Sequence, residues 1–165
     1  MKNFKIVVLI VVICVLVFGG CYSFTGSSVP PHLKTVAIPL FEDQSGFGET
    51  NLREKFTKKL NDLFVSDNSL EISDRTNANA ILEGAIVTIS DAPSVISPGE
   101  QVITRRVTMT VHASFTDMTQ RKKMWEKDFS QWGEYTQGNE TRTTALEQAI
   151  NKVAQDILLE TVSGW

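Results

Sequence analysis

Cysteine and histidine are scarce in this sequence, and their scarcity excludes several classes of function. Among 165 residues there are two cysteines and two histidines, which are Cys14, Cys21, His32 and His112. Metal centres and Ser-His-Asp triads need more such side chains, placed together. We therefore expect no metal, no cofactor and no enzymatic activity. His112 lies among threonines in a predicted strand, so we expect a surface imidazole there.

A phosphate-binding glycine loop and an excess of basic charge are lacking as well. Gly46 and Gly48 are not followed by the Lys-Ser or Lys-Thr pair of a nucleotide-binding loop, and turn geometry explains them. The chain carries 16 basic and 19 acidic residues, which gives a formal charge of −3. General nucleic-acid binding requires a basic surface, and this composition argues against it.

The first 20 residues have the three parts of a secretory signal peptide. Lys2 and Lys5 precede an unbroken apolar run over residues 6–18, and two glycines stand immediately before Cys21. A cysteine in that place is typical of a lipoprotein signal, because its thiol then carries a diacylglyceryl group. Two or more acyl chains, such as palmitate, hold a protein stably on a membrane. We predict that residues 1–20 are removed and that Cys21 is the site of lipid attachment.

An uncleaved membrane helix is the alternative interpretation of this segment. The apolar run has 13 residues, and as a helix it would span about 20 Å. The hydrocarbon core of a membrane is roughly 30 Å thick. With the signal removed, 145 residues remain, with a formal charge of −5 and no second cysteine for a disulfide. The stability of the mature domain then depends on packing alone.

After the signal, the hydrophobic pattern predicts a tether over residues 21–34 and a single domain over residues 35–165. Period-two alternation indicates strands, and apolar residues at helical spacing indicate two helices, each with one apolar stripe. Asn51 with Glu54, and Thr144 with Glu147, have the spacing of capping boxes. The expected strands are 35–41, 70–73, 80–89, 102–115 and 124–135, the helices are 52–65 and about 144–158, and the connections include loops at 42–50 and 91–100 and a turn at 117–123.

These elements predict an α+β fold with two layers. The strand at 102–115 alternates valine, methionine, alanine and phenylalanine with threonine, histidine and serine. Such alternation is typical of a sheet with one buried and one solvated face. We therefore expect a two-layer sandwich in which two helices pack on one face of a mixed four- to five-stranded sheet. The other face is expected to be polar.

Two clusters of basic residues are the candidate sites of phosphate contact. Arg105 and Arg106 stand at the start of the long strand, and Arg121, Lys122 and Lys123 occupy the predicted hairpin turn. In an acidic chain, such local clusters are candidates for contact with phosphate groups. The alternative is a solvated turn whose charges protect a strand edge from pairing with other chains.

Taken together, the mature chain resembles the LptE family of lipopolysaccharide-assembly lipoproteins. The resemblance rests on Cys21, the prolyl tether and four segments, which read TVAIPLFEDQSGFGE, VTMTVHASF, WEKDFSQWGEY and ALEQAINKVAQDIL. It implies a non-enzymatic, periplasm-facing lipoprotein of the outer membrane that plugs and helps to assemble an LptD-type β-barrel and contacts lipopolysaccharide. The first segment also resembles TolB and CsgG-type periplasmic domains. A structural or secretion-channel lipoprotein is therefore the alternative function.

Overall fold

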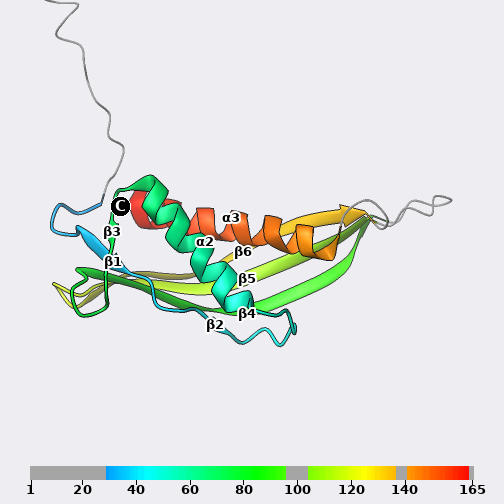
Figure 1. Cartoon of the computed structure of the whole chain (residues 1–165), viewed down its shortest axis with the longest axis horizontal. Helices are drawn as coiled ribbons and strands as arrows, with labels where there is room; N and C mark the ends of the chain where they lie inside the picture. Colours follow the sequence, from blue (N-terminus) through cyan, green and yellow to red (C-terminus); the bar gives the residue numbers. More distant parts are fainter. Residues whose placement is uncertain (1–28, 96–103, 137–140, 164–165) are drawn as a thin grey trace, which may run out of the picture.

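The computed structural model describes residues 29–95, 104–136 and 141–163 of this chain. In these residues the chain forms two helices and six strands (Figure 1). In chain order they are β1 (Thr35–Ala37), β2 (Glu42–Asp43), α2 (Leu52–Asp67), β3 (Glu71–Ile72), β4 (Ala80–Val95), β5 (Thr104–Asp117), β6 (Lys122–Thr136) and α3 (Arg142–Ser163).

The six strands form one mixed sheet in the order β3-β1-β4-β5-β6, with β2 paired beside β4. The short strands run parallel to their neighbours, while β4, β5 and β6 form a long antiparallel meander. Both helices lie over the same face of this sheet (Figure 1). The predicted two-layer α+β fold is thus confirmed, with six strands in place of four or five. The additional strand is β2, which forms inside the segment that was predicted to be the 42–50 loop.

The alternation of β5 decides which face of the sheet carries the core. From Val107 to Phe115, every second side chain of this strand is fully buried beneath the helices, and those between them are half-buried. Burial of apolar surface at such positions is the main favourable term in folding. The fully buried side chains are those of Val107, Met109, Val111, Ala113 and Phe115. We call this side the covered face and the opposite side the open face.

The first helix has the predicted apolar stripe but not the predicted N-terminal cap. Leu52, Phe56, Leu60 and Phe64 of α2 are buried, as expected from their spacing. Asn51, however, adopts the left-handed conformation (φ 58°), and its side chain caps no backbone N–H. The Asn51–Glu54 capping box is therefore wrong, because a cap residue needs an extended backbone to aim its side chain at the first turn.

The last helix likewise begins differently from the prediction and packs as expected. Thr141 Oγ1 accepts the backbone N–H of Thr144 at 3.2 Å, so Thr141 caps α3 and Thr144 already lies inside its first turn. The predicted Thr144–Glu147 capping box is wrong by one helical turn. The buried stripe of α3 contains all the predicted residues, Leu146, Ala149, Ile150, Val153, Ile157 and Leu158.

The central strand β4 is longer than the sequence indicated. Ala80, Ile81 and Leu82 are buried in succession, whereas Val87 is 41% exposed, and the strand continues through Asp91 and Pro93 to Val95. Residues 91–95 are therefore strand and not loop, and the rest of the predicted 91–100 loop lies outside the described residues. Pro93 is tolerated beside a register shift between Pro93 and Val95, where the ladder is already interrupted.

Candidate functional site

The turn between β5 and β6 presents three consecutive cations, Arg121, Lys122 and Lys123. All three residues are exposed. Lys123 Nζ lies 2.6 Å from Glu126 Oε2, and this bond lowers the pKa of Glu126, with a smaller contribution from His112. Within the described residues, the side chains of Arg121 and Lys122 have no carboxylate partner. Two of the three cations of the turn are thus available to an anion from outside the domain.

The conformation of this turn is fixed by Asp117. Its buried carboxylate accepts the backbone N–H groups of Thr119 and Gln120 at 2.7 and 2.9 Å. Arg121 then adopts the left-handed conformation (φ 54°), which is unusual for a residue other than glycine. The two hydrogen bonds hold the cations of the turn at defined positions relative to β5.

The entry of the chain into the domain is bonded to the same turn. His32 Nε2 lies 2.6 Å from Asp117 Oδ2. Burial alone would raise the pKa of Asp117, but His32 and the backbone N–H groups of Gln120 and Thr119 lower it below its usual value. The entry segment and the β5–β6 turn lie at one end of the molecule (Figure 1). Sequence reasoning missed this contact, since no local pattern relates two residues that are 85 positions apart.

The other predicted cations, Arg105 and Arg106, are engaged with carboxylates. Arg105 Nε lies 2.9 Å from Asp91 Oδ1 and 3.0 Å from the Tyr135 hydroxyl, and these bonds raise the pKa of Arg105. Arg106 donates to Glu134 Oε1 at 2.8 and 3.1 Å. Neither guanidinium is therefore free for a phosphate group without first giving up a carboxylate.

The structure places the two predicted clusters at opposite ends of the β5–β6 hairpin. Arg105 pairs with Tyr135 where the hairpin is open, whereas Asp117 pairs with Lys122 beside the turn. At about 3.3 Å per residue, the strand between Arg105 and Asp117 is roughly 40 Å long. The five cations therefore form two separate sites, and among the described residues only the turn presents cations without a carboxylate partner.

His112 lies on the open face, as predicted, but it has two acidic neighbours. Its Nδ1 is 2.7 Å from Asp128 Oδ1, and its Nε2 is 3.2 Å from Glu126 Oε1. These carboxylates, Asp128 first, raise the pKa of His112. No group of three or more histidine, cysteine or acidic side chains in the described part of the chain is arranged to hold a metal ion.

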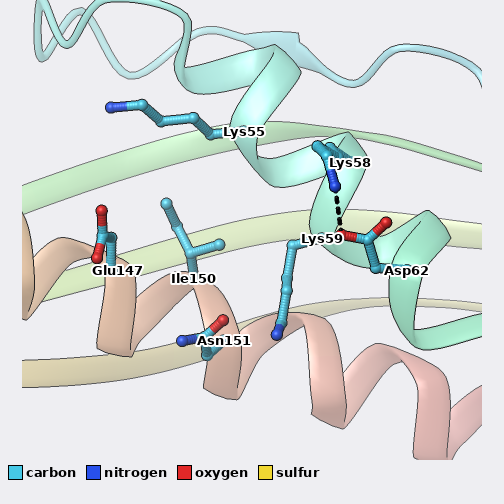
Figure 2. Close-up of a pocket in the computed structure, with 7 residues that line it drawn as sticks. All are labelled: Lys55, Lys58, Lys59, Asp62, Glu147, Ile150 and Asn151. Atoms are coloured by element: carbon cyan, nitrogen blue, oxygen red, sulfur yellow. Dashed lines mark hydrogen bonds and ion pairs between the residues drawn. The ribbon is translucent and has the colours of Figure 1, made fainter. Parts of the chain in front are cut away.

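A groove lies between α2 and α3 in the helical layer (Figure 2). It encloses about 290 Å³. Lys58 pairs with Asp62 at 2.6 Å across one turn of α2, and Lys55 pairs with Glu49 at 2.9 Å. Lys59 extends toward α3, beside Asn151 (Figure 2). The groove is thus an open, largely charge-paired seam between the helices, lined by Lys55, Lys58, Lys59, Asp62, Glu147, Ile150 and Asn151.

The predicted anchor, Cys21, and the signal segment 1–20 lie outside the described residues. Among the residues that are described, neither helix is long and apolar enough to cross a membrane. The described chain starts at Val29, which packs against the core, and Leu33 is buried within that core.

The extent of the fold coincides with a match to a known family. A model of the LptE family, described as lipopolysaccharide-assembly, matches residues 33–161. This range starts at the buried Leu33 and ends in the last turn of α3, so it includes all six strands, α2 and all but the last two residues of α3. The chain belongs to the LptE family. LptE proteins are non-enzymatic lipoproteins, and this membership supports an envelope lipoprotein of lipopolysaccharide assembly.

Solved structures share the LptE-type fold of this chain at very low sequence identity. The hypothetical protein CT253 from Chlamydia trachomatis has a TM-score of 0.62 at 8% identity, covering 78% of this chain and 95% of its own. The rare lipoprotein B from Shewanella oneidensis has a TM-score of 0.52 at 12% identity, with coverages of 77% and 92%. The PelC dodecamer from Paraburkholderia phytofirmans has 0.52 at 14% identity, with 84% and 95%. No curated protein matches the sequence.

Proposed function

We propose that this LptE-family chain is a non-enzymatic component of the outer-membrane lipopolysaccharide-assembly translocon. In this role it plugs an LptD-type β-barrel from the periplasmic side and assists its assembly. The observation that carries the proposal is the family match over residues 33–161, which extends from the entry of the chain into the domain to the last turn of α3. No cofactor is needed for such a role, because the chain acts by occupying and stabilising its partner.

The proposed location depends on Cys21 as a lipid anchor. Lys2, Lys5, the apolar run and the two glycines before Cys21 support a lipoprotein signal. Metabolic labelling with a palmitate analogue tests the anchor. We expect label on the wild-type protein and none on Cys21→Ala, which should also keep its signal segment. Label that persists on Cys21→Ala would contradict the lipoprotein assignment.

The barrel partner can be tested by purification from membranes. We expect the detergent-extracted full chain to bring down one large β-barrel protein in equal amounts. A ring made of many copies of this chain, without a barrel, would instead favour the alternative of a secretion-channel lipoprotein. The PelC dodecamer has a related fold, but at 14% identity that likeness concerns the fold alone. Analytical ultracentrifugation of the purified material separates the two outcomes by mass.

Phosphate contact is the third part of the proposal. All five candidate cations were selected from the sequence, but Arg105, Arg106 and Lys123 lie against Asp91, Glu134 and Glu126. A charge that is already paired offers less to a phosphate, because the existing partner must first be displaced. We therefore assign the contact with lipopolysaccharide or lipid phosphate to Arg121 and Lys122.

A further inference from the structure

We infer that the end of the domain where the chain enters rests on the phosphate headgroups of the membrane that holds the lipid anchor. The contacting residues are Met118, Arg121 and Lys122, which we call the headgroup surface. The inference rests on the proposed anchor at Cys21 and deepens it, since it names the surface that meets the membrane and the chemical class of its ligand.

Chain length limits how far this surface can lie from the membrane. Only eight residue steps separate Cys21 from Val29, where the described chain begins to pack on the core. Even a fully extended chain covers at most about 29 Å in eight steps. The entry end must therefore stay within that distance of the acyl chains. The open end of the hairpin lies roughly 40 Å farther along β5.

The entry segment and the headgroup surface are held together by defined bonds. His32 is bonded to Asp117 at 2.6 Å, and the backbone N–H of Met118 donates to the carbonyl of Asn79 at 2.8 Å. The side chain of Asn79 in turn accepts the backbone N–H of Lys34 at 3.1 Å. A membrane that anchors the chain at residue 21 therefore also keeps the β5–β6 turn close to its surface.

The chemistry of the headgroup surface suits an anionic membrane. Arg121 and Lys122 are exposed and have no carboxylate partner among the described residues. Met118 beside them is 42% exposed, which provides an apolar side chain for the interfacial region. Asp117, the carboxylate of the turn, is fully buried and directed toward His32. Basic residues near an anionic membrane surface are attracted to it.

The turn carries two adjacent cations that are unpaired in the described part of the chain, and Lys34 of the entry segment is exposed as well. Glu71 of β3, which pairs with β1, and Asp74 of the loop after β3 are exposed. An adsorption driven by charge therefore brings the β5–β6 turn, and not the β3 side, against the headgroups.

Fluorescence quenching in vesicles can test this orientation. The full-length, lipid-anchored protein is labelled either at Thr119→Cys, in the turn, or at Thr143→Cys, at the start of α3. Both positions are exposed threonines. Mass spectrometry first verifies the acyl chains on Cys21. Each protein is then placed in vesicles of phosphatidylcholine alone, with phosphatidylglycerol, or with rough lipopolysaccharide, and a quencher attached to headgroups reports proximity.

We expect the label at position 119 to be quenched in phosphatidylglycerol vesicles and released by salt, while the label at 143 stays unquenched. Each cation removed should weaken the binding equilibrium by about fivefold. The double variant Arg121→Ser, Lys122→Ser should therefore shift the equilibrium away from the bound orientation by roughly 25-fold at low ionic strength. Lys58→Ser with Lys59→Ser removes the same charge from α2 and should leave the quenching unchanged.

Three outcomes would overturn the inference. Equal quenching at positions 119 and 143 in phosphatidylglycerol vesicles would show that the turn does not face the membrane. Quenching only in vesicles with lipopolysaccharide would assign the contact to that ligand and not to the membrane lipids. A Cys21 without acyl chains would remove the anchor itself, and this failure is visible by mass before any vesicle is made.

Discussion

Arg105 and Arg106 are neighbours in sequence, but their side chains lie on opposite faces of the sheet and have different partners. On the covered face, Arg105 is held by Asp91 and by the hydroxyl of Tyr135, which is itself 8% exposed. On the open face, Arg106 pairs with Glu134, and the two side chains are 41% and 35% exposed. Its guanidinium also lies 4.1 Å from the ring centroid of Trp132.

This difference shows that the face on which a strand residue lies decides how strongly its side chain affects stability, even where two neighbours are of the same type. On the covered face a charge must be fixed by several partners, because burial without them is costly. On the open face the same charge remains in contact with water, and its ion pair adds little. We therefore expect substitutions on the covered face to change stability strongly, and their neighbours on the open face to change it weakly.

The largest contrast is expected between Phe115 and Ser114. Phe115 is fully buried on the covered face, whereas Ser114 points to the open face. Truncating a buried phenylalanine to alanine typically costs about 3–5 kcal/mol of unfolding free energy. Chemical denaturation of Phe115→Ala should show this loss, and Ser114→Ala should change the free energy of unfolding by less than about 0.5 kcal/mol. Equal losses would mean that the faces are wrongly assigned.

Gly133 tests how closely α3 lies on the covered face. A Cβ added at this position would approach the carbonyl oxygen of Ala145 to 2.1 Å, and that oxygen belongs to the helix backbone. Because a backbone cannot rotate aside, Gly133→Ala should cost about 3 kcal/mol. Ser130→Ala on the exposed side of the same strand is the control. If Gly133→Ala unfolds at the wild-type denaturant concentration, α3 does not pack against β6 as described.

A smaller loss of unfolding free energy is expected from removing a charge on the covered face. Asp91 accepts hydrogen bonds from Arg105 and Tyr135 and lies 3.5 Å from Arg142 Nε. Asp91→Asn keeps the shape but removes the charge, and hydrogen bonds to charged groups are worth about 1.5–3 kcal/mol. We expect a loss of about 1–2 kcal/mol in the free energy of unfolding.

Glu134→Gln is the matched control on the open face. It removes the same charge from the ion pair with Arg106, but that pair is partly solvated, so a loss of at most about 1 kcal/mol is expected. Denaturant titrations of both variants in parallel provide the comparison. A larger loss for Glu134→Gln than for Asp91→Asn would reverse the ranking of the two faces.

Most of the fold could be predicted because its core obeys simple periodicities. The alternation over Val107–Phe115 and the stripe over Leu146–Leu158 both follow from local geometry, and both are confirmed. The wrong predictions concern positions whose secondary structure depends on tertiary contacts. Residues 91–95 were expected to be loop because Pro93 interrupts the pattern, but Arg105 and Tyr135 bind Asp91 and extend the strand.

The candidate site was less predictable, since a sequence shows which charges exist and not which are already paired. Five cations were selected as equals, and three of them lie against carboxylates from other strands or another part of the same strand. The bond between His32 and Asp117 depends on the whole sheet, because it joins the entry segment to the end of β5. The prediction of Cys21 as lipid anchor depends on the signal segment alone and stays a prediction.

The smallest expected effect is a pH dependence that arises on the open face. His112 lies between Asp128 and Glu126, and these carboxylates raise its pKa above the value of the unfolded chain. The protonated ring is therefore favoured in the folded state. Its contribution to stability is fully present below about pH 6.5 and is lost as the pH rises through the raised pKa. Because the side chain is 43% exposed, we expect at most about 1 kcal/mol.

Denaturant titrations of wild type and His112→Gln at pH 5.5 and pH 8.5 measure this contribution. The wild type should exceed the variant in stability at pH 5.5, and the difference should shrink or vanish at pH 8.5. Both proteins retain His32 and Asp117, so the entry segment contributes equally to both and cancels in the comparison. A difference that grows with pH would mean that the two carboxylates do not stabilise the imidazolium, and the open face would then contribute no measurable electrostatic stability at this position.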